Sequence, residues 1–327
     1  MIVDTYLDVP VIKYLDIMQC PEGQISKYFV RLVADGMGMP IFVPVMVARG
    51  KNPGSILGIT AATHGNELNG IPVVQRLFKE LEEEIELLNG IIIGVPVMNV
   101  PGYLSMERRF NDGIDLNRIM PGKPDGNMSE VYAHRLTDRI VSQFDYLLDM
   151  HTASFGRVNS YYIRANIEDP ETYALAQLQN AQIILNSPAK DQTVRGVVQS
   201  NGGKAITLEV GDPNKFQRSV IRSGLSGIHN TLIHLGMVDG EYENNSAPPV
   251  VCEKSFWIHT DKGGILQVLP NVTDFVQEGE RIAIMRNVFG DTIKEYFAPQ
   301  HGIVIGKSVH PVSQTGSRIL HLGIARV

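Results

Sequence analysis

Apolar and polar positions follow one pattern between residues 55 and 240 and another beyond residue 250. In the first stretch, short apolar runs alternate with longer segments whose apolar residues recur every three or four positions. Such runs are typical of buried strands, and such spacing is typical of amphipathic helices. Strands are therefore predicted at residues 56–61, 91–97, 146–149, 160–163, 181–185 and 205–209, and helices at 68–88, 127–143, 170–180 and 218–235.

This alternation of strands and helices indicates an α/β sheet that is covered by helices on both faces. The region before it, residues 1–50, alternates loosely between apolar and polar positions and is interrupted by Gly and Pro. Within it, residues 29–34 and 41–48 are predicted as an antiparallel pair of strands around a turn at 35–38. We interpret residues 1–50 as a β-rich lead-in to the sheet.

The C-terminal part of the chain lacks helical periodicity. Residues 241–249 form a polar segment that ends in two prolines, and beyond it short apolar runs are separated by glycines. This pattern is typical of a small all-β module. The sequence therefore predicts one domain over residues 1–240 and a β-module over residues 250–327.

Composition narrows the class of protein. The 327 residues are 43% hydrophobic and 20% charged, which suits a folded chain, and the net charge of −6 argues against binding of nucleic acid by general electrostatics. Cys20 and Cys252 fit no disulfide or cysteine–zinc pattern. No signal peptide is apparent, and no apolar run approaches the ~18 residues of a membrane span. We expect a soluble, cytoplasmic protein with no membrane partner.

Three residues at predicted strand ends could bind a metal ion. His64 and Glu67 follow the strand at 56–61, and their imidazole and carboxylate groups both suit Zn²⁺. Such a pair alone is more often a helix start with a surface carboxylate. His151 follows the strand at 146–149, and in open α/β sheets catalytic groups collect beyond the carboxyl ends of strands. Together they predict a catalytic zinc site, because three protein ligands leave a fourth position for water.

A hydrolytic zinc site also needs a base and a cation. Glu209 ends the strand at 205–209 and is the candidate base for the attacking water, although it could instead be a surface carboxylate. Arginines could stabilise an oxyanion or hold a substrate carboxylate. The candidates lie on the loop after strand 91–97 and just after His151, and they are Arg108, Arg109, Arg118 beside Asn117, Arg157 and Arg164.

These candidates fall within four short motifs, which are His64-Gly65-Asn66-Glu67, Asp115-Leu116-Asn117-Arg118, Asp149-Met150-His151-Thr152 and Leu208-Glu209-Val210-Gly211. In their order and spacing they resemble the motifs of the succinylglutamate desuccinylase/aspartoacylase family, which belongs to the zinc carboxypeptidase clan. The resemblance covers roughly residues 50 to 235. It implies a doubly wound α/β fold with a mixed central sheet.

The resemblance also implies roles for individual residues. His64, Glu67 and His151 would bind one Zn²⁺ per chain, and Glu209 would be the general base. An arginine upstream of the Asn–Arg pair polarises the scissile carbonyl in that family, and Arg109 is the choice here, with Arg108 as the near alternative. The carboxylate of an acyl amino acid would be held by Asn117 and Arg118. Arg157 is a further candidate for substrate binding because of its charge and its position just after His151, and not because of the resemblance.

Two segments differ from aspartoacylase itself. Residues 153–159, directly after His151, differ where the substrate side-chain pocket is expected. In the C-terminal module, residues 297–306 resemble a biotinyl/lipoyl-type β-barrel but lack the Met-Lys-Met turn, so neither biotin nor lipoate is expected. The module is expected to wall the cleft or to support a homo-oligomer.

The first functional hypothesis is a zinc amidohydrolase that removes an acetyl or succinyl group from an amino acid or a related amine, its small-molecule substrate. A second is a zinc carboxypeptidase that trims C-terminal residues from a peptide. A third is a non-catalytic metal- or ligand-binding relative, against which the presence of Glu209 beside all three ligands argues. The sequence leaves open which acyl group and which amine are recognised.

Overall fold

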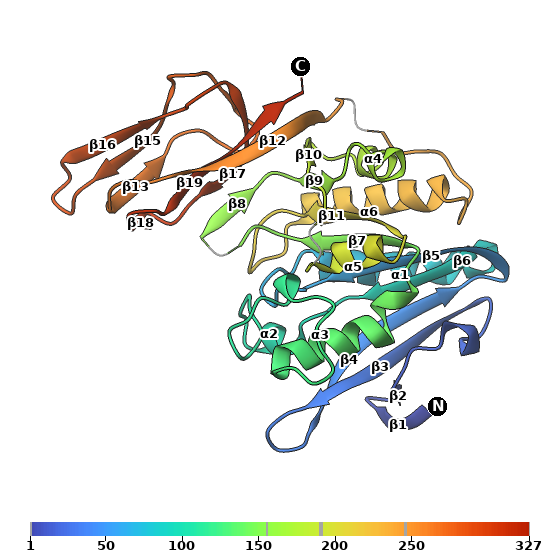
Figure 1. Ribbon diagram of the computed structural model, residues 1–327. Coiled ribbons are helices and arrows are strands. Elements are labelled where there is room, and N and C mark those ends of the chain that lie inside the picture. The colour runs from blue at the N-terminus through green and yellow to red at the C-terminus, as the bar shows by residue number, and fades with distance from the viewer. Residues whose placement is uncertain (1, 155, 190–191, 245–246, 327) are drawn as a thin grey trace.

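The structure, a computed structural model, describes residues 2–154, 156–189, 192–244 and 247–326. Among these residues a mixed sheet of fifteen strands extends through the molecule, and a separate four-stranded sheet lies among the C-terminal strands (Figure 1). The first strands of the chain lie at one end of the molecule and the last strands at the other. No helix of the described residues has the length and apolar character needed to cross a membrane.

The large sheet is built from most of the strands of the chain. They are β1 (Ile2–Tyr6), β2 (Val9–Ile12), β3 (Gln24–Ala34), β4 (Pro40–Arg49), β5 (Asn52–Ala61), β6 (Asn89–Val95), β7 (Tyr146–His151), β8 (Arg157–Asn159), β9 (Tyr162–Ala165), β10 (Ile183–Asn186), β11 (Lys204–Glu209), β12 (Val250–His259), β14 (Phe275–Val276), β17 (Gly302–Ser308) and β19 (Arg318–Ala325). Their order is β1-β2-β3-β4-β6-β5-β7-β11-β9-β10-β12-β19-β17-β14, and β8 pairs with β17.

The centre of this sheet is parallel. β6, β5, β7 and β11 run side by side in the same direction, with β4 and β9 antiparallel to them on either side. Parallel strands all end at the same edge of a sheet, and ligand sites in α/β proteins form beyond these carboxyl ends. The segments after β5, β7 and β11 therefore meet in space although they are far apart in the sequence.

Helices cover both faces of the sheet. They are α1 (Gly70–Glu84), α2 (Val100–Leu104), α3 (Met128–Arg139), α4 (Pro170–Gln177), α5 (Val194–Ser200) and α6 (Arg218–His234), with short 3₁₀ turns at Ile17–Gln19, Ile85–Leu87, Leu116–Arg118 and Val141–Gln143. Leu148 of β7 packs in one core with α1, α4 and α6, whereas its neighbour Leu147 packs in a second core with α3 and α5. Because successive strand residues point to opposite faces, both cores form around one sheet, and the predicted α/β arrangement is confirmed.

Most of the predicted elements occur close to their expected positions. The apolar run at 205–209 corresponds to β11, and the helical pattern at 68–88 corresponds to α1 followed by a 3₁₀ turn. The antiparallel pair expected around the turn at 35–38 is formed by β3 and β4. The short helix α5 was not predicted, because its seven residues span only two turns and give little periodicity.

The C-terminal strands continue the large sheet. β12 pairs in parallel with β10, and β19, β17 and β14 follow it. The four-stranded sheet is made of β13 (Gly264–Val268), β15 (Arg281–Arg286), β16 (Thr292–Phe297) and β18 (Val312–Ser313), and it shares a core with these strands. The described residues from 250 onward thus form strands without helices, as predicted, while the barrel type and the domain boundaries remain predictions. Of the linker at 241–249, Asn245 and Ser246 lie outside the described residues.

A small core joins the two parts of the molecule. It contains Tyr162 of β9, Ile183 and Leu185 of β10, Cys252 of β12, and Ile303 and Ile305 of β17, all of them buried. Strand pairing and apolar packing therefore both connect the β-module to the α/β region.

Replacing Ile305 with Ala is expected to lower the free energy of unfolding by about 2–5 kcal/mol, because the smaller side chain leaves a cavity in the buried core that joins the two parts of the molecule. Val312, which is 77% exposed, is the control, and V312A should change stability by less than about 0.5 kcal/mol. Urea unfolding measures both variants. Fluorescence of Trp257, the single tryptophan, reports on the module, and circular dichroism reports on the whole fold. The unfolding transitions seen by fluorescence and by circular dichroism are expected to coincide. Separate transitions would contradict the conclusion that the β-module and the α/β region form one continuous structure.

Candidate active site

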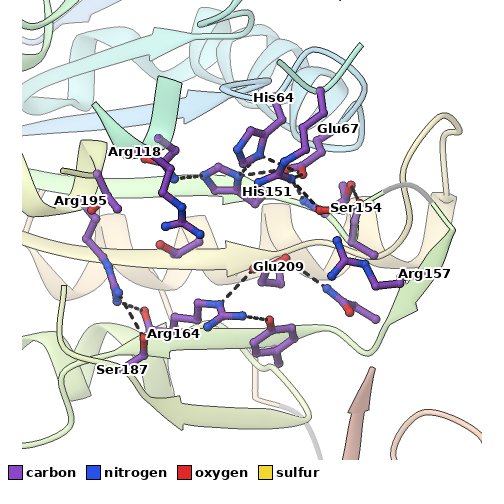
Figure 2. A pocket seen from close by; sticks show the side chains of 18 of the residues that line it. His64, Glu67, Arg118, His151, Ser154, Arg157, Arg164, Ser187, Arg195 and Glu209 are labelled. Carbon is purple, nitrogen blue, oxygen red and sulfur yellow. Dashed lines mark hydrogen bonds and ion pairs between the residues drawn. The ribbon is translucent and has the colours of Figure 1, made fainter. Parts of the chain in front are cut away.

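Two adjacent parallel strands bring three candidate metal ligands together. β5 ends at Ala61, and the turn after it carries His64 and Glu67 before α1 begins. β7, the neighbour of β5, ends at His151. All three side chains are buried, and one candidate ligand atom from each lies within 4.8 Å of the others (Figure 2). The structure thus brings together the three residues that the sequence predicts as metal ligands.

The turn between the first two ligands depends on a glycine. Gly65 lies so close to the backbone of Gly102 that a Cβ atom would be 2.0 Å from the Gly102 carbonyl carbon. Ala62, at the start of the turn, has a φ of 50°, in the left-handed region. This tight backbone directs the two side chains, three positions apart, toward the same point.

The orientation of the two imidazoles suits a metal ion. The Nδ1 atoms of His64 and His151 are 3.1 Å apart, and each lies 2.9 Å from an oxygen of Glu67. The opposite nitrogens contact carboxylates: His64 Nε2 is 3.0 Å from Asp115 Oδ1, and His151 Nε2 is 2.9 Å from Asp149 Oδ2. An Nε2–H that donates to a carboxylate leaves the Nδ1 lone pair free, which is the usual outer arrangement of histidine ligands at zinc.

The charge at this cluster also suits a cation. Burial alone would raise the pKa of Glu67, but His64 and His151 hold it well below its usual range. Burial alone would lower the pKa of His151, but Asp149 and Glu67 raise it well above its usual value. The carboxylates therefore favour positive charge at the centre of the cluster, and a divalent ion can take the place of protons there. Two imidazoles and a carboxylate are a donor set that fits Zn²⁺.

Of the two neighbouring arginines considered for the oxyanion, the structure places Arg108 in the pocket. Its Nη1 donates to Glu67 Oε1 at 2.8 Å and to Ser154 Oγ at 2.6 Å, and its Nη2 donates to Asp115 Oδ2 at 3.0 Å. Arg109 is exposed, bonds to the carbonyl oxygen of Gly113 and does not line the pocket. The resemblance implied Arg109, with Arg108 as the near alternative, but only Arg108 lies in the pocket, because consecutive residues of a loop point in different directions.

Asn117 and Arg118 both line the pocket. They lie on the 3₁₀ turn Leu116–Arg118, which Asp115 caps by accepting from the Asn117 backbone. The side-chain oxygen of Asn117 accepts from the backbone nitrogen of Val194, and its amide nitrogen lies 3.4 Å from His151 Nε2. Asn117 is thereby fixed between α5 and the candidate metal ligands, whereas the side chain of Arg118 is exposed at the pocket.

Glu209 lies beside the candidate metal ligands because of strand register. β11 pairs with β7 so that Glu209 is the direct neighbour of His151. Its carboxylate is almost fully buried, and two side chains hold it: Arg164 Nε donates to Oε1 at 3.1 Å and Asn159 Nδ2 donates to Oε2 at 3.2 Å. Glu209 is therefore a positioned carboxylate inside the pocket and not a surface group.

The segment after His151 contributes to the pocket wall. Ser154, Arg157 and Asn159 line the cavity, while Phe155 lies outside the described residues. Arg164, expected to add positive charge for the substrate, is instead bonded to Glu209. Burial alone would lower the pKa of Arg164, but Tyr162 and Glu209 raise it, so this guanidinium stays charged.

The cavity has a volume of about 400 Å³. Sequence reasoning missed several of the residues that line it, among them Ser187, Arg195, Trp257 and Arg318. Arg195 is buried on α5, and its Nη1 donates to the carbonyl oxygen of Arg164 at 2.8 Å. Trp257 and Arg318 belong to β12 and β19 of the C-terminal module. Arg195 could have been found from the sequence, because it is an arginine within the otherwise apolar segment Val194–Val198. No local pattern marks the residues of the module.

Comparisons with known proteins agree with this geometry. A model of the succinylglutamate desuccinylase/aspartoacylase catalytic domain matches residues 53–235. The chain is also 26% identical over 281 residues to the N-alpha-acetyl-L-2,4-diaminobutyric acid deacetylase of Halomonas elongata, an alignment that covers 82% of this chain and 81% of that protein.

Solved structures share the fold over nearly the whole chain. A succinylglutamate desuccinylase/aspartoacylase from Rhodobacter sphaeroides superposes with a TM-score of 0.82 at 23% identity, covering 93% of this chain and 96% of that one. The product-bound ectoine utilization protein EutE (DoeB) from Ruegeria pomeroyi superposes with a TM-score of 0.82 at 21% identity, covering 92% and 95%. Since the family model matches more than half of the chain, this protein belongs to the succinylglutamate desuccinylase/aspartoacylase family.

Proposed function

We propose that this protein is a zinc-dependent amidohydrolase that removes an acetyl or succinyl group from the nitrogen of an amino acid or a related amine. The observation that carries the proposal is that Glu209 lies directly beside His151. His151 itself forms a cluster with His64 and Glu67. A base next to three candidate metal ligands is the minimal set for metal-assisted hydrolysis. The deacetylase name of the Halomonas relative supports the same reaction type.

Each residue of the cluster has a distinct role in this proposal. His64, Glu67 and His151 hold the ion, whose chemistry when bound is to acidify water and to polarise a carbonyl. Glu209 accepts the proton of the attacking water and donates it to the amine nitrogen as the amide C–N bond breaks. Arg164, whose Nε donates to Glu209 Oε1, holds this carboxyl group in position for both transfers.

In this proposal, arginines stabilise the negative charges of the developing oxyanion and of the substrate carboxylate. Arg108 faces the pocket beside Glu67, and a guanidinium has five N–H donors, so it can also donate to the acyl oxygen as negative charge develops there. Arg118 is well suited to hold the carboxylate of the amino acid in a forked pair of hydrogen bonds. Asn117, which also lines the pocket, adds a further polar group.

The wall formed by the β-module favours a small substrate over a peptide. Trp257 and Arg318 come from this module and line the same cavity as the candidate metal ligands. A carboxypeptidase needs a cleft that admits a polypeptide, whereas a deacylase works in a closed pocket. A screen of N-acyl amino acids against short peptides distinguishes the two reactions.

Zinc should bind at about one ion per chain, and H151A should lose this ion because one of three protein ligands is removed. Elemental analysis after dialysis measures the metal, and zinc should raise the melting temperature of the unmodified protein. The matched control is H229A, since His229 lies outside the pocket and pairs with the exposed side chain of Glu80. A protein that binds no zinc when purified without chelators, or whose activity is indifferent to chelators, would contradict the metal assignment.

E209Q should keep its zinc but lower the turnover number by about 10²–10⁴-fold, because an amide cannot accept the proton of water. The measurement is the release of free amino acid from an N-acyl amino acid, with zinc content determined on the same samples. E253Q, at an exposed carboxylate of the module, is the control and should be unaffected. Unchanged turnover of E209Q would refute the assignment of the base.

The neighbouring arginines offer a direct comparison. R108A should lower the turnover number by about 10²–10³-fold, because it removes a donor to the developing oxyanion. R109A should change it by less than about twofold, because Arg109 lies outside the pocket. Zinc content must be measured in both variants, since Arg108 also contacts Glu67. Equal losses in the two variants would contradict this assignment.

A further inference from the structure

Six arginines line the candidate pocket, and only two of them have acidic partners. They are Arg108, Arg118, Arg157, Arg164, Arg195 and Arg318. Arg108 pairs with Glu67 and Asp115, and Arg164 pairs with Glu209. Across the part of the chain that the structure describes, none of the other four has a carboxylate within ion-pair distance. Positive charges gathered without counterions repel one another, and bound anions would relieve this repulsion.

The four arginines without acidic partners do not all lie together. Figure 2 shows Arg118 and Arg195 on one side of the reacting centre and Arg157 on the other, with His151 and Glu209 between them. An amide bond held at this centre extends in two directions, with the amine part on one side and the acyl part on the other. A substrate that satisfies both groups of arginines must therefore carry an anionic group on each part.

The group around Arg157 is built on one aromatic ring. The Arg157 guanidinium carbon lies 5.4 Å from the centroid of the Trp257 ring, and that of Arg318 lies 4.9 Å from it. The indole stacks on His321, with ring centroids 4.8 Å apart and an angle of 9° between the planes. His321 is buried and contacts Ser255 Oγ at 2.8 Å, so the indole rests on a fixed support. Arg157, Trp257 and Arg318 are called the Trp257 cluster below.

Among the described residues, neither arginine of the Trp257 cluster forms an ion pair with a carboxylate, although the charges of Glu209 and Glu67 act on Arg157. Burial, together with the charges of Arg318 and Arg108, lowers the pKa of Arg157 to about 10, which still leaves it cationic near neutral pH. Burial and the nearby arginines lower the pKa of His321 to about 3, so this ring remains neutral. The cluster therefore presents two guanidinium groups toward the cavity, a geometry that suits a carboxylate.

We propose that the Trp257 cluster binds a carboxylate carried by the acyl group, so that the substrates are N-succinyl-type amino acids rather than N-acetyl amino acids. This inference rests on the amidohydrolase function proposed above. Water adds across the amide bond, the acyl carbon takes the hydroxyl oxygen, and the nitrogen takes a proton. The products are a free dicarboxylic acid and a free amino acid. The carboxylate of the amine part remains with Asn117 and Arg118 on the opposite side.

The test compares N-succinyl and N-acetyl derivatives of the same amino acids with the zinc-loaded protein. Alanine, aspartate, glutamate and 2,4-diaminobutyrate provide neutral, acidic and basic side chains. The measured quantity is the ratio of kcat/KM for the succinyl compound to that for the acetyl compound. The ratio should exceed ten for the preferred amino acid, and R157Q and R318Q should each lower it about tenfold, because each removes a charge-assisted hydrogen bond.

R286Q is the matched control, since Arg286 also lies in the module but bonds to Gln267 outside the pocket. It should leave the ratio unchanged, and melting temperatures should show that all three variants are folded. A preference for acetyl compounds across all four amino acids would overturn the inference. A succinyl preference that R157Q and R318Q leave intact would overturn the assignment to the Trp257 cluster.

Calorimetric binding of N-succinyl-L-glutamate to E209Q separates failure of this inference from failure of the proposed function. If no N-acyl compound is hydrolysed but the ligand binds, and R157Q or R318Q weakens binding in the E209Q background, the pocket assignment holds and the hydrolytic function fails. If N-acetyl compounds are hydrolysed and N-succinyl-L-glutamate does not bind, the hydrolytic function holds and this inference is wrong. If the ligand neither binds nor reacts and no N-acyl compound is hydrolysed, both are wrong.

Discussion

The parallel pairing of β5, β7 and β11 is the constraint on which the site depends. Its hydrogen bonds set the end of β5 beside the end of β7, and they set Glu209 beside His151. A slip of one residue in this register would turn every side chain of the strand to the opposite face. The apolar residues of β7 and β11, which pack alternately into two cores, prevent such a slip. The position of the candidate base is therefore enforced by the same packing that stabilises the sheet.

Regular hydrophobic patterns explain how much of this could be predicted from the sequence. β11 and α1 were predicted because their apolar residues have a clear run or spacing, and the residues directly after buried strands then gave His64, His151 and Glu209. Arg108 could not be distinguished from Arg109, since loop residues carry no periodicity and only the folded backbone determines their direction. Trp257 and Arg318 could not be predicted for another reason. Their contact with the pocket depends on how β12 and β19 extend the large sheet, which is a long-range pairing.

The C-terminal module is accordingly more than an attached domain. It continues the central sheet through β12, shares a buried core with β9 and β10, and supplies part of the pocket wall. The expectation that it would wall the cleft agrees with this placement. Its strands also give the pocket a rigid boundary, because residues on strands are held more firmly than residues on loops.

The division of the pocket between two parts of the chain has an evolutionary consequence. The candidate chemical groups come from strand ends before residue 210, whereas Trp257 and Arg318 come from strands after residue 250. Substitutions in the later strands can change which molecules fit without touching the residues proposed to break the bond. Relatives with one reaction and many substrates can then arise by substitutions in the module alone, while the candidate metal ligands and the candidate base stay unchanged.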